Sequence, residues 1–363
     1  MYRLLGNIVS PAGPRARLAI LAFHRVLPEP DPLLADEVDA ADFERLIMFL
    51  RREFNVLPLA EACARLGRNS LPARALSLTF DDGYANNAHV ALPILLRHGL
   101  SATFFVATGF LDGGTMFNDR IIEIVRGAPP GGHDLGALAL SAPGLPPLLS
   151  LTLAGDSSRR AAIDALIPHL KYRPLDERRE LVARLAAALG GTSPPPLMMR
   201  SGDVRRLADS GMQIGGHTIN HPILMQLDER TARAEIVGGK RRLEEITGSP
   251  VTLFAYPNGK PGGDYDARHV ELVKRAGFAA AVSTINGVAG RDTDRFQLPR
   301  CGLWNQSPRR LGARLLANCL HPARPAMPAA GGDDAAAGAP QRMFSASLAP
   351  DPSPRGRGEH MDT

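Results

Sequence analysis

Short apolar runs alternate with amphipathic segments along most of the chain. Within 42–54, apolar residues recur at the spacing of one helical face. Runs such as ALSLTF at 75–80 are short and continuous, which favours buried strands. The expected strands are 18–23, 56–57, 75–80, 102–107, 212–215, 251–256 and 279–283. The expected helices are 42–54, 60–66, 87–98, 159–170, 175–189, 202–210, 229–247 and 266–276.

Continuous apolar strands separated by helices predict an α/β protein whose parallel sheet is covered on both faces. About seven such units suit a distorted (β/α)7 TIM-like barrel. An open doubly wound sheet is the alternative, but no glycine-rich nucleotide fingerprint follows the first strand.

The alternation of strands and helices divides the chain into an N-terminal extension, a barrel domain that contains an insertion, and a tail. Residues 1–17 are an N-terminal extension and 18–321 the barrel domain. An insertion at about 127–196 is loop-like to about 155 and helical afterwards. Residues 322–363 contain ten Ala, seven Pro and five Gly, too few large apolar side chains to offset the entropy of ordering. We therefore expect a disordered tail.

Composition and charge limit which binding partners and which cellular compartment we expect. The net charge of +5 is scattered over 363 residues without a basic run, so we expect no nucleic acid partner. No apolar stretch is long enough for a membrane span. Cys63, Cys301 and Cys319 form neither a disulfide framework nor a thiolate zinc site. The N-terminus lacks the apolar core of a secretory signal, so we expect a cytoplasmic protein, with its oligomeric state left open.

Polar residues lie at or just after the ends of four of the predicted strands. They are His24, the Asp81–Asp82 pair, His217 with His221, and Tyr256. In a parallel barrel the carboxyl ends of the strands form one face, and that face holds the active site. We therefore expect these residues to converge.

Asp81 and Asp82 end an apolar strand, where two adjacent carboxylates are costly unless they bind a cation or move a proton. The alternative is a solvated Asp-Gly turn or a helix cap. His217 and His221 lie four residues apart, and Pro222 disfavours a helix there. They are either exposed loop histidines or metal ligands, and Asp82 would complete a two-histidine, one-carboxylate site.

Four further residues are weaker candidates. His24 is either a packed histidine or a general acid, since its ordinary pKa lies near neutrality. The backbone N–H of Tyr256 is either part of a turn or an oxyanion donor. Arg300 and Trp304 are possible accessory residues, although a loop or surface position is the simpler interpretation of each.

Three motifs resemble those of the polysaccharide deacetylases of carbohydrate esterase family 4. They are TFDDGY at 79–84, HTINHP at 217–222 and FAYPNG at 254–259, within a resemblance that covers roughly 18–305. FHRV at 23–26 looks like an early segment of the poly-N-acetylglucosamine deacetylase branch, in which this histidine is the general acid.

The resemblance implies a distorted (β/α)7 barrel and a divalent metal, most often Zn²⁺. The implied ligands are Asp82, His217 and His221, and the implied base is Asp81. Many members carry an arginine in the third motif that orients this base, where Phe254 and Ala255 stand here.

Arg300 and Trp304 bear on the two family motifs that this chain does not match. Arg300 is a candidate replacement for the missing arginine. Trp304 does not reproduce the spacing of the Asp-Trp motif that many members contain.

The activity implied is hydrolysis of N-acetyl groups on an N-acetylated polysaccharide or oligosaccharide, with release of acetate. The alternatives are a non-catalytic carbohydrate-binding or assembly protein on the same scaffold, and an amidase acting on a small non-sugar amide. The presence of base, ligand triad and acid together favours catalysis.

Overall fold

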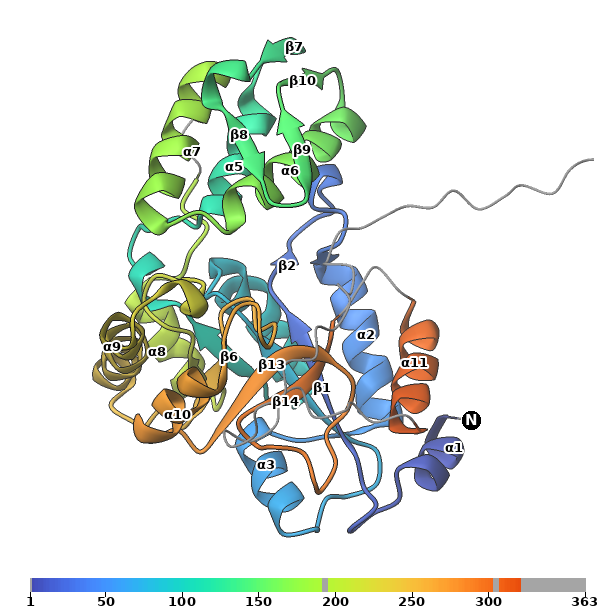
Figure 1. Cartoon of the computed structure of the whole chain (residues 1–363). Coiled ribbons are helices and arrows are strands. Elements are labelled where there is room, and N and C mark those ends of the chain that lie inside the picture. The colour runs from blue at the N-terminus through green and yellow to red at the C-terminus, as the bar shows by residue number, and fades with distance from the viewer. Residues whose placement is uncertain (1, 191–194, 303–306, 321–363) are drawn as a thin grey trace, which may run out of the picture. The chain divides into compact units, whose positions relative to one another are not determined.

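Seven parallel strands close into a barrel in the computed structural model of the chain, which describes residues 2–190, 195–302 and 307–320 (Figure 1). In order around the barrel they are β1 (Leu18–Phe23), β5 (Ala75–Phe80), β6 (Thr103–Val106), β11 (Gln213–Gly216), β12 (Leu253–Ala255), β13 (Ala280–Asn286) and β14 (Leu298–Gly302). β1 pairs with both β5 and β14, which closes the ring. The predicted (β/α)7 barrel is confirmed.

One predicted strand does not belong to this ring. The strand expected at 56–57 is β4 (Asn55–Val56), which pairs with only the first two residues of β5. The seventh barrel strand is instead β14, which the sequence analysis did not include. Its run LPRCG contains a proline and an arginine, so it lacks the continuous apolar signature of the other strands.

Alternation along the strands separates the inside of the barrel from its helix-facing side. Leu18 and Ile20 of β1 belong to a cluster made largely of residues from the barrel strands. Ala19, Leu21 and Phe23 belong to a second cluster that they share with surrounding helices. Successive side chains of a strand point to opposite faces, so both faces of β1 are apolar and buried.

Helices surround the strands (Figure 1). The helices outside the predicted insertion are α1 (Tyr2–Val9), α2 (Ala40–Glu53), α3 (Leu59–Gly67), η2 (Asn87–Ala91), α4 (Leu92–Arg97), α5 (Phe117–Gly127), α8 (Ser201–Asp209), α9 (Glu229–Thr247), α10 (Ala267–Arg275) and α11 (Pro308–Leu320). Shorter elements are β2 (Val26–Leu27), β3 (Val38–Asp39) and the single turns η1 (Pro32–Leu34), η3 (Thr108–Phe110) and η5 (Leu224–Gln226). The helix predicted at 229–247 is confirmed at both ends, where the Asp228 side chain caps its start and Gly248 ends it in a left-handed conformation.

The first part of the insertion is not the loop that we expected. It forms two antiparallel pairs, β7 (Gly131–Asp134) with β10 (Ser150–Leu153) and β8 (Leu140–Ala142) with β9 (Leu145–Leu148). The turn η4 (Gly136–Leu138) lies between β7 and β8. Several of the glycines and prolines that argued for a loop lie inside strands, Gly131 and Gly132 in β7 and Pro146 and Pro147 in β9. The alternation of polar and apolar residues in β10 is a strand signal that we missed.

The helical half of the insertion is confirmed as α6 (Asp156–Lys171) and α7 (Leu175–Leu189). Together with α5 these helices bury a hydrophobic cluster separate from that of the barrel.

The ends of the chain complete the description. The extension at 1–17 contains α1, which we did not predict. Trp304 and the tail expected at 322–363 lie outside the described residues. Among the helices that the structure describes, none is both long and apolar enough to cross a membrane.

Candidate active site

The register of neighbouring strands brings the predicted site residues to one end of the barrel. β1 and β5 pair residue by residue up to Phe23 and Phe80, so His24 and Asp81 leave the sheet side by side. The N–H of Asp81 donates to the carbonyl of Phe23 at 2.9 Å. His217 leaves β11 at the same end of the barrel.

Asp82, His217 and His221 form a compact group of three potential ligands. Each offers one atom, and the three atoms lie within 4.8 Å of one another. Asp82 Oδ1 is 3.4 Å from Nε2 of His217 and 3.4 Å from Nε2 of His221. Two imidazoles and one carboxylate are a ligand set that a divalent metal accepts while keeping positions open for water or substrate.

Hydrogen bonding and burial put these three groups in the protonation states that metal binding requires. Nδ1 of His217 lies 2.7 Å from the carbonyl oxygen of Ala255, which can only accept, so Nδ1 carries the proton and Nε2 offers its lone pair toward Asp82. Burial lowers the pKa of His221 to about 3, so its imidazole is neutral. Burial alone would raise the pKa of Asp82, but the imidazoles of His217 and His221 beside it outweigh burial and lower that pKa, so its carboxylate is ionised. The residues present therefore fit a divalent metal ion.

The backbone of the ligand segments is strained. Asp82, Thr218 and His221 have φ angles of 73°, 65° and 51°, in the left-handed region that side-chain-bearing residues seldom adopt. Such conformations cost about 1–3 kcal/mol each and persist only where surrounding structure imposes them. Their concentration at three positions of one small group indicates that this geometry is held for a function.

Helix α9 imposes that geometry on the histidine loop. The carboxylate of Glu235 accepts hydrogen bonds from the backbone N–H groups of Ile219 and Asn220 at 2.9 and 2.8 Å. Gly239 lies so close that a Cβ there would come within 2.7 Å of the Thr218 carbonyl oxygen. Glu235 was not predicted from the sequence. The available signal was a carboxylate at helical spacing on the apolar face of the helix, between Ala232 and Gly239.

The second carboxylate of the pair, Asp81, lies against Arg300. Nη1 and Nη2 of Arg300 donate to Oδ1 and Oδ2 of Asp81 at 2.8 and 2.7 Å, and both residues are buried. Nε of Arg300 donates to the carbonyl of Ser283 at 2.9 Å, which fixes the guanidinium plane. Burial would raise the pKa of Asp81, but the charge and hydrogen bonds of Arg300 outweigh it and hold that pKa below its ordinary value. An arginine from β14 thus stands beside Asp81, although the third motif lacks one.

His24 occupies the rim of the site. Its side chain is exposed, whereas Asp81 and Asp82 are buried. Desolvation opposes protonation of His24, but the charges of neighbouring carboxylates, Asp82 and Glu37 first, outweigh it and raise the pKa of His24. Glu37 also accepts a hydrogen bond from the backbone N–H of Arg25 at 3.2 Å.

A buried polar cluster is formed by Asp119, Tyr84 and Arg25, the residue after His24. The carboxylate of Asp119 is 3.7 Å from Nη1 of Arg25 and accepts a hydrogen bond from the Tyr84 hydroxyl at 3.3 Å. Arg25 follows His24 in the chain, and Tyr84 lies two residues after Asp82. Burial raises the pKa of Asp119 to about 7. This contact ties helix α5 to two segments of the site, and it was not foreseen because Asp119 has no motif around it.

One predicted residue, Tyr256, has a different outcome. The N–H of Tyr256 donates to the carbonyl of Val282 at 3.2 Å, which continues the pairing of β12 with β13. Because that donor is already engaged, the structure does not support Tyr256 as an oxyanion donor. Its ring stacks on Tyr265 with centroids 3.9 Å apart, which makes it a core residue.

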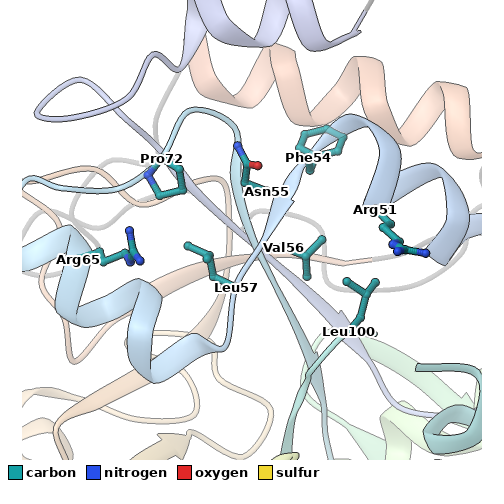
Figure 2. A pocket seen from close by; sticks show the side chains of 8 residues that line it. All are labelled: Arg51, Phe54, Asn55, Val56, Leu57, Arg65, Pro72 and Leu100. Carbon is teal, nitrogen blue, oxygen red and sulfur yellow. The ribbon is translucent and has the colours of Figure 1, made fainter. Parts of the chain in front are cut away.

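A separate open hollow of about 410 Å³ lies at the opposite end of the barrel, beside β4 (Figure 2). Asn55 and Val56 of its wall pair with the first residues of β5, whereas Asp81 and Asp82 follow the last. Arg51 contributes to the lining, and none of the predicted site residues does.

These features define a class of protein: a parallel (β/α)7 barrel whose carboxyl end holds a candidate Asp-His-His metal site with a second, arginine-paired aspartate beside it. The family model described as polysaccharide deacetylase matches residues 68–151 and 191–281, which include both the aspartate pair and the histidine pair. The chain belongs to the polysaccharide deacetylase family, and this membership supports deacetylation of a polysaccharide as the class of activity.

Individual relatives are distant. The putative polysaccharide deacetylase YxkH of Bacillus subtilis is 20% identical over 287 residues, covering 78% of this chain and 71% of that protein. The Streptococcus pyogenes deacetylase PplD, solved in complex with acetate, has a TM-score of 0.55 at 19% identity, over 82% of this chain and 96% of that one. IcaB from Ammonifex degensii has a TM-score of 0.54 at 18% identity, over 85% of this chain and 98% of that one. At these identities the solved structures establish the fold.

Proposed function

We propose that the chain is a divalent-metal-dependent hydrolase that removes N-acetyl groups from an N-acetylated polysaccharide or oligosaccharide and releases acetate. The observation that carries the proposal is the buried group of Asp82, His217 and His221 directly beside the arginine-paired Asp81. The segment 23–26, with His24 at the rim, supports a place in the poly-N-acetylglucosamine deacetylase-like branch.

Asp82, His217 and His221 would hold the metal, and Zn²⁺ is the ion that we propose because it accepts two imidazole nitrogens and one carboxylate oxygen. When bound, such an ion polarises an acetamide carbonyl and lowers the pKa of water. The left-handed backbone at Asp82, Thr218 and His221 and the hydrogen bonds of Glu235 hold the three metal-binding side chains in place before any metal binds.

Asp81 is the proposed general base. It lies next to the ligand Asp82 in the chain but is not one of the three grouped ligands. Each of its oxygens accepts one hydrogen bond from Arg300 and keeps a second lone pair that can take the proton of the attacking water. Arg300 favours the ionised form of Asp81 and fixes the plane of its carboxylate. A positioned general base contributes typically ~10²–10⁴-fold to rate.

His24 is the proposed general acid. Amide nitrogen leaves poorly unless it is protonated as the carbon–nitrogen bond breaks, and His24 lies at the rim where a sugar chain would approach. The nearby carboxylates raise the pKa of His24, so His24 is protonated in a larger fraction of the molecules near neutral pH. Donation of that proton leaves acetate and a free amine on the sugar.

The test is acetate release from N-acetylglucosamine oligomers by the wild type, by chelated protein and by chelated protein supplied with zinc. We expect activity to disappear on chelation and to return with zinc. Asp81→Asn should retain the metal and lose turnover by about 10²–10⁴-fold. Asp209→Asn makes the same chemical change at an exposed position of α8 and serves as the matched control.

Two outcomes would contradict the proposal. Binding of the oligomers without acetate release, in zinc-loaded protein, would indicate a carbohydrate-binding protein. Hydrolysis of a small acetamide but not of the oligomers would indicate an amidase with a different substrate.

A further inference from the structure

We infer that α1 and α11 form a docking surface for an anionic lipid membrane, on which the protein rests peripherally. We call this the α1–α11 surface and define it by the exposed Leu4, Leu5, Ile8 and Leu320 together with Arg3, Arg309 and Arg310. The inference concerns where the chain is placed and is independent of the proposed chemistry.

The two helices lie side by side in a parallel arrangement. The hydroxyl of Tyr2 donates to the carbonyl of Arg309 at 2.9 Å, at the start of both helices. A Cβ on Gly6 would lie 3.3 Å from Leu316, one helical turn or more further along each. The ring of Tyr2 also contacts Phe49 of α2, with centroids 5.5 Å apart. The inner faces of α1 and α11 are therefore used for packing, and Figure 1 shows both helices at the edge of the barrel.

The outer face is apolar although it faces solvent. Leu4 is 73% exposed and Ile8 76%, one turn apart on α1, and Leu5 is 46% exposed beside them. On α11, Ala313, Ala317 and Leu320 are exposed at helical spacing. Single exposed apolar residues are ordinary, but a cluster on two adjacent helices marks a surface that is covered by something else.

The positive charge of α1 and α11 indicates an anionic partner for this surface. α1 and α11 contain four arginines and no acidic residue. Arg3, Arg309 and Arg310 are exposed, and no described carboxylate forms an ion pair with them. Exposed apolar side chains on helices whose only charged residues are arginines are typical of helices that lie in the interface of a bilayer containing anionic lipids.

Two other occupants fit this surface less well. A second copy related by a two-fold axis would bring arginine against arginine with no acidic partner on either helix. The segment 322–363, with five acidic residues and four arginines, has 22 of its 42 residues as Ala, Pro or Gly and offers few large apolar side chains.

The test is sedimentation of the full chain with phosphatidylcholine vesicles and with vesicles that also contain phosphatidylglycerol. We expect binding only to the anionic vesicles, weakened by salt. Arg309→Gln should weaken binding about fivefold. Leu4→Gln combined with Ile8→Gln should abolish it, and glutamine keeps the helix propensity of α1.

Matched controls and contrary results make the test decisive. Leu96→Gln on α4 and Arg206→Gln on α8 change exposed residues outside the surface and should bind as the wild type does. Absence of binding to anionic vesicles, or equal binding by the Leu4/Ile8 variant, would overturn the inference. So would a dimer in light scattering that this variant dissociates, or vesicle binding that appears only after residues 322–363 are removed.

Discussion

The contact between Arg300 and Asp81 offers a quantitative test of how the site is built. Arg300→Met removes two charge-assisted hydrogen bonds and leaves the Asp81 carboxylate buried without a cation. Removing one partner of a buried pair costs about 3–5 kcal/mol, because the remaining charge is uncompensated. We expect the free energy of unfolding, measured by chemical denaturation at neutral pH, to fall by that amount.

A double-mutant cycle separates the pair from other effects of the substitution. In Arg300→Met with Asp81→Asn neither buried charge remains, so the double variant should be destabilised by less than the sum of the two single variants. Because the side chains of Arg300 and Asp81 are 2% and 5% exposed, solvent does not screen the pair and the coupling should exceed about 1 kcal/mol. Additive losses would refute the reasoning.

The pH profile of kcat/KM, measured on the same variants, is an independent test of the pair. Arg300 lowers the pKa of Asp81, so the ionised carboxylate contributes stability above its unfolded pKa and loses it as pH falls through the folded value. Without Arg300 the pKa of Asp81 rises, and the acidic limb of the profile of kcat/KM should move to higher pH. Arg300→Lys keeps a charge but not the bidentate geometry, and its limb should move less. An unchanged limb in Arg300→Met would contradict Asp81 as the base.

Four further predictions concern the metal, the acid and the packing around them. His217→Ala should lose most bound zinc, because two ligands hold it poorly; full occupancy by elemental analysis would remove His217 from the ligand set. His24→Ala should bind zinc normally but lose far more activity on an acetamide than on an activated ester, whereas equal losses would assign it an orienting role. Burial raises the pKa of Asp119 to about 7, so the contribution of Asp119 to the free energy of unfolding should fall as pH rises from about 4 to 7. Asp119→Asn should abolish that fall, with a gain of up to about 4 kcal/mol above pH 7, and a pH dependence that survives in this variant would exclude Asp119 as its source. Gly239→Ala should push on the Thr218 backbone and lower both zinc affinity and melting temperature, and wild-type affinity would show that the loop yields freely.

The repeating pattern of the sequence was sufficient to predict the barrel. Continuous apolar strands alternating with helices permit few arrangements, and the ends of parallel strands share one face, so Asp82 and His217 could be expected to meet. The strand at 298–302 was missed because Pro299 and Arg300 interrupt its apolar run, where Arg300 pairs with Asp81.

Contacts between distant segments were harder to foresee. The family resemblance made Arg300 a candidate partner of Asp81, but the pairing joins residues 219 positions apart and nothing local to either residue specifies it. The hydrogen bond from the Tyr256 N–H to Val282 depends on the register of two strands, which cannot be read from the sequence. The hairpins of the insertion were hidden because their glycines and prolines are equally typical of loops.

The most direct test of the central claim is mass spectrometry of a defined N-acetylglucosamine oligomer incubated with zinc-loaded protein in heavy-oxygen water. The account predicts sugar products that are each lighter by whole acetyl groups, intact glycosidic bonds, and acetate that carries one heavy oxygen from the attacking water. It also predicts that Asp81→Asn gives none of these products at comparable times. An unchanged oligomer, or label in a shortened sugar chain in place of acetate, would contradict it.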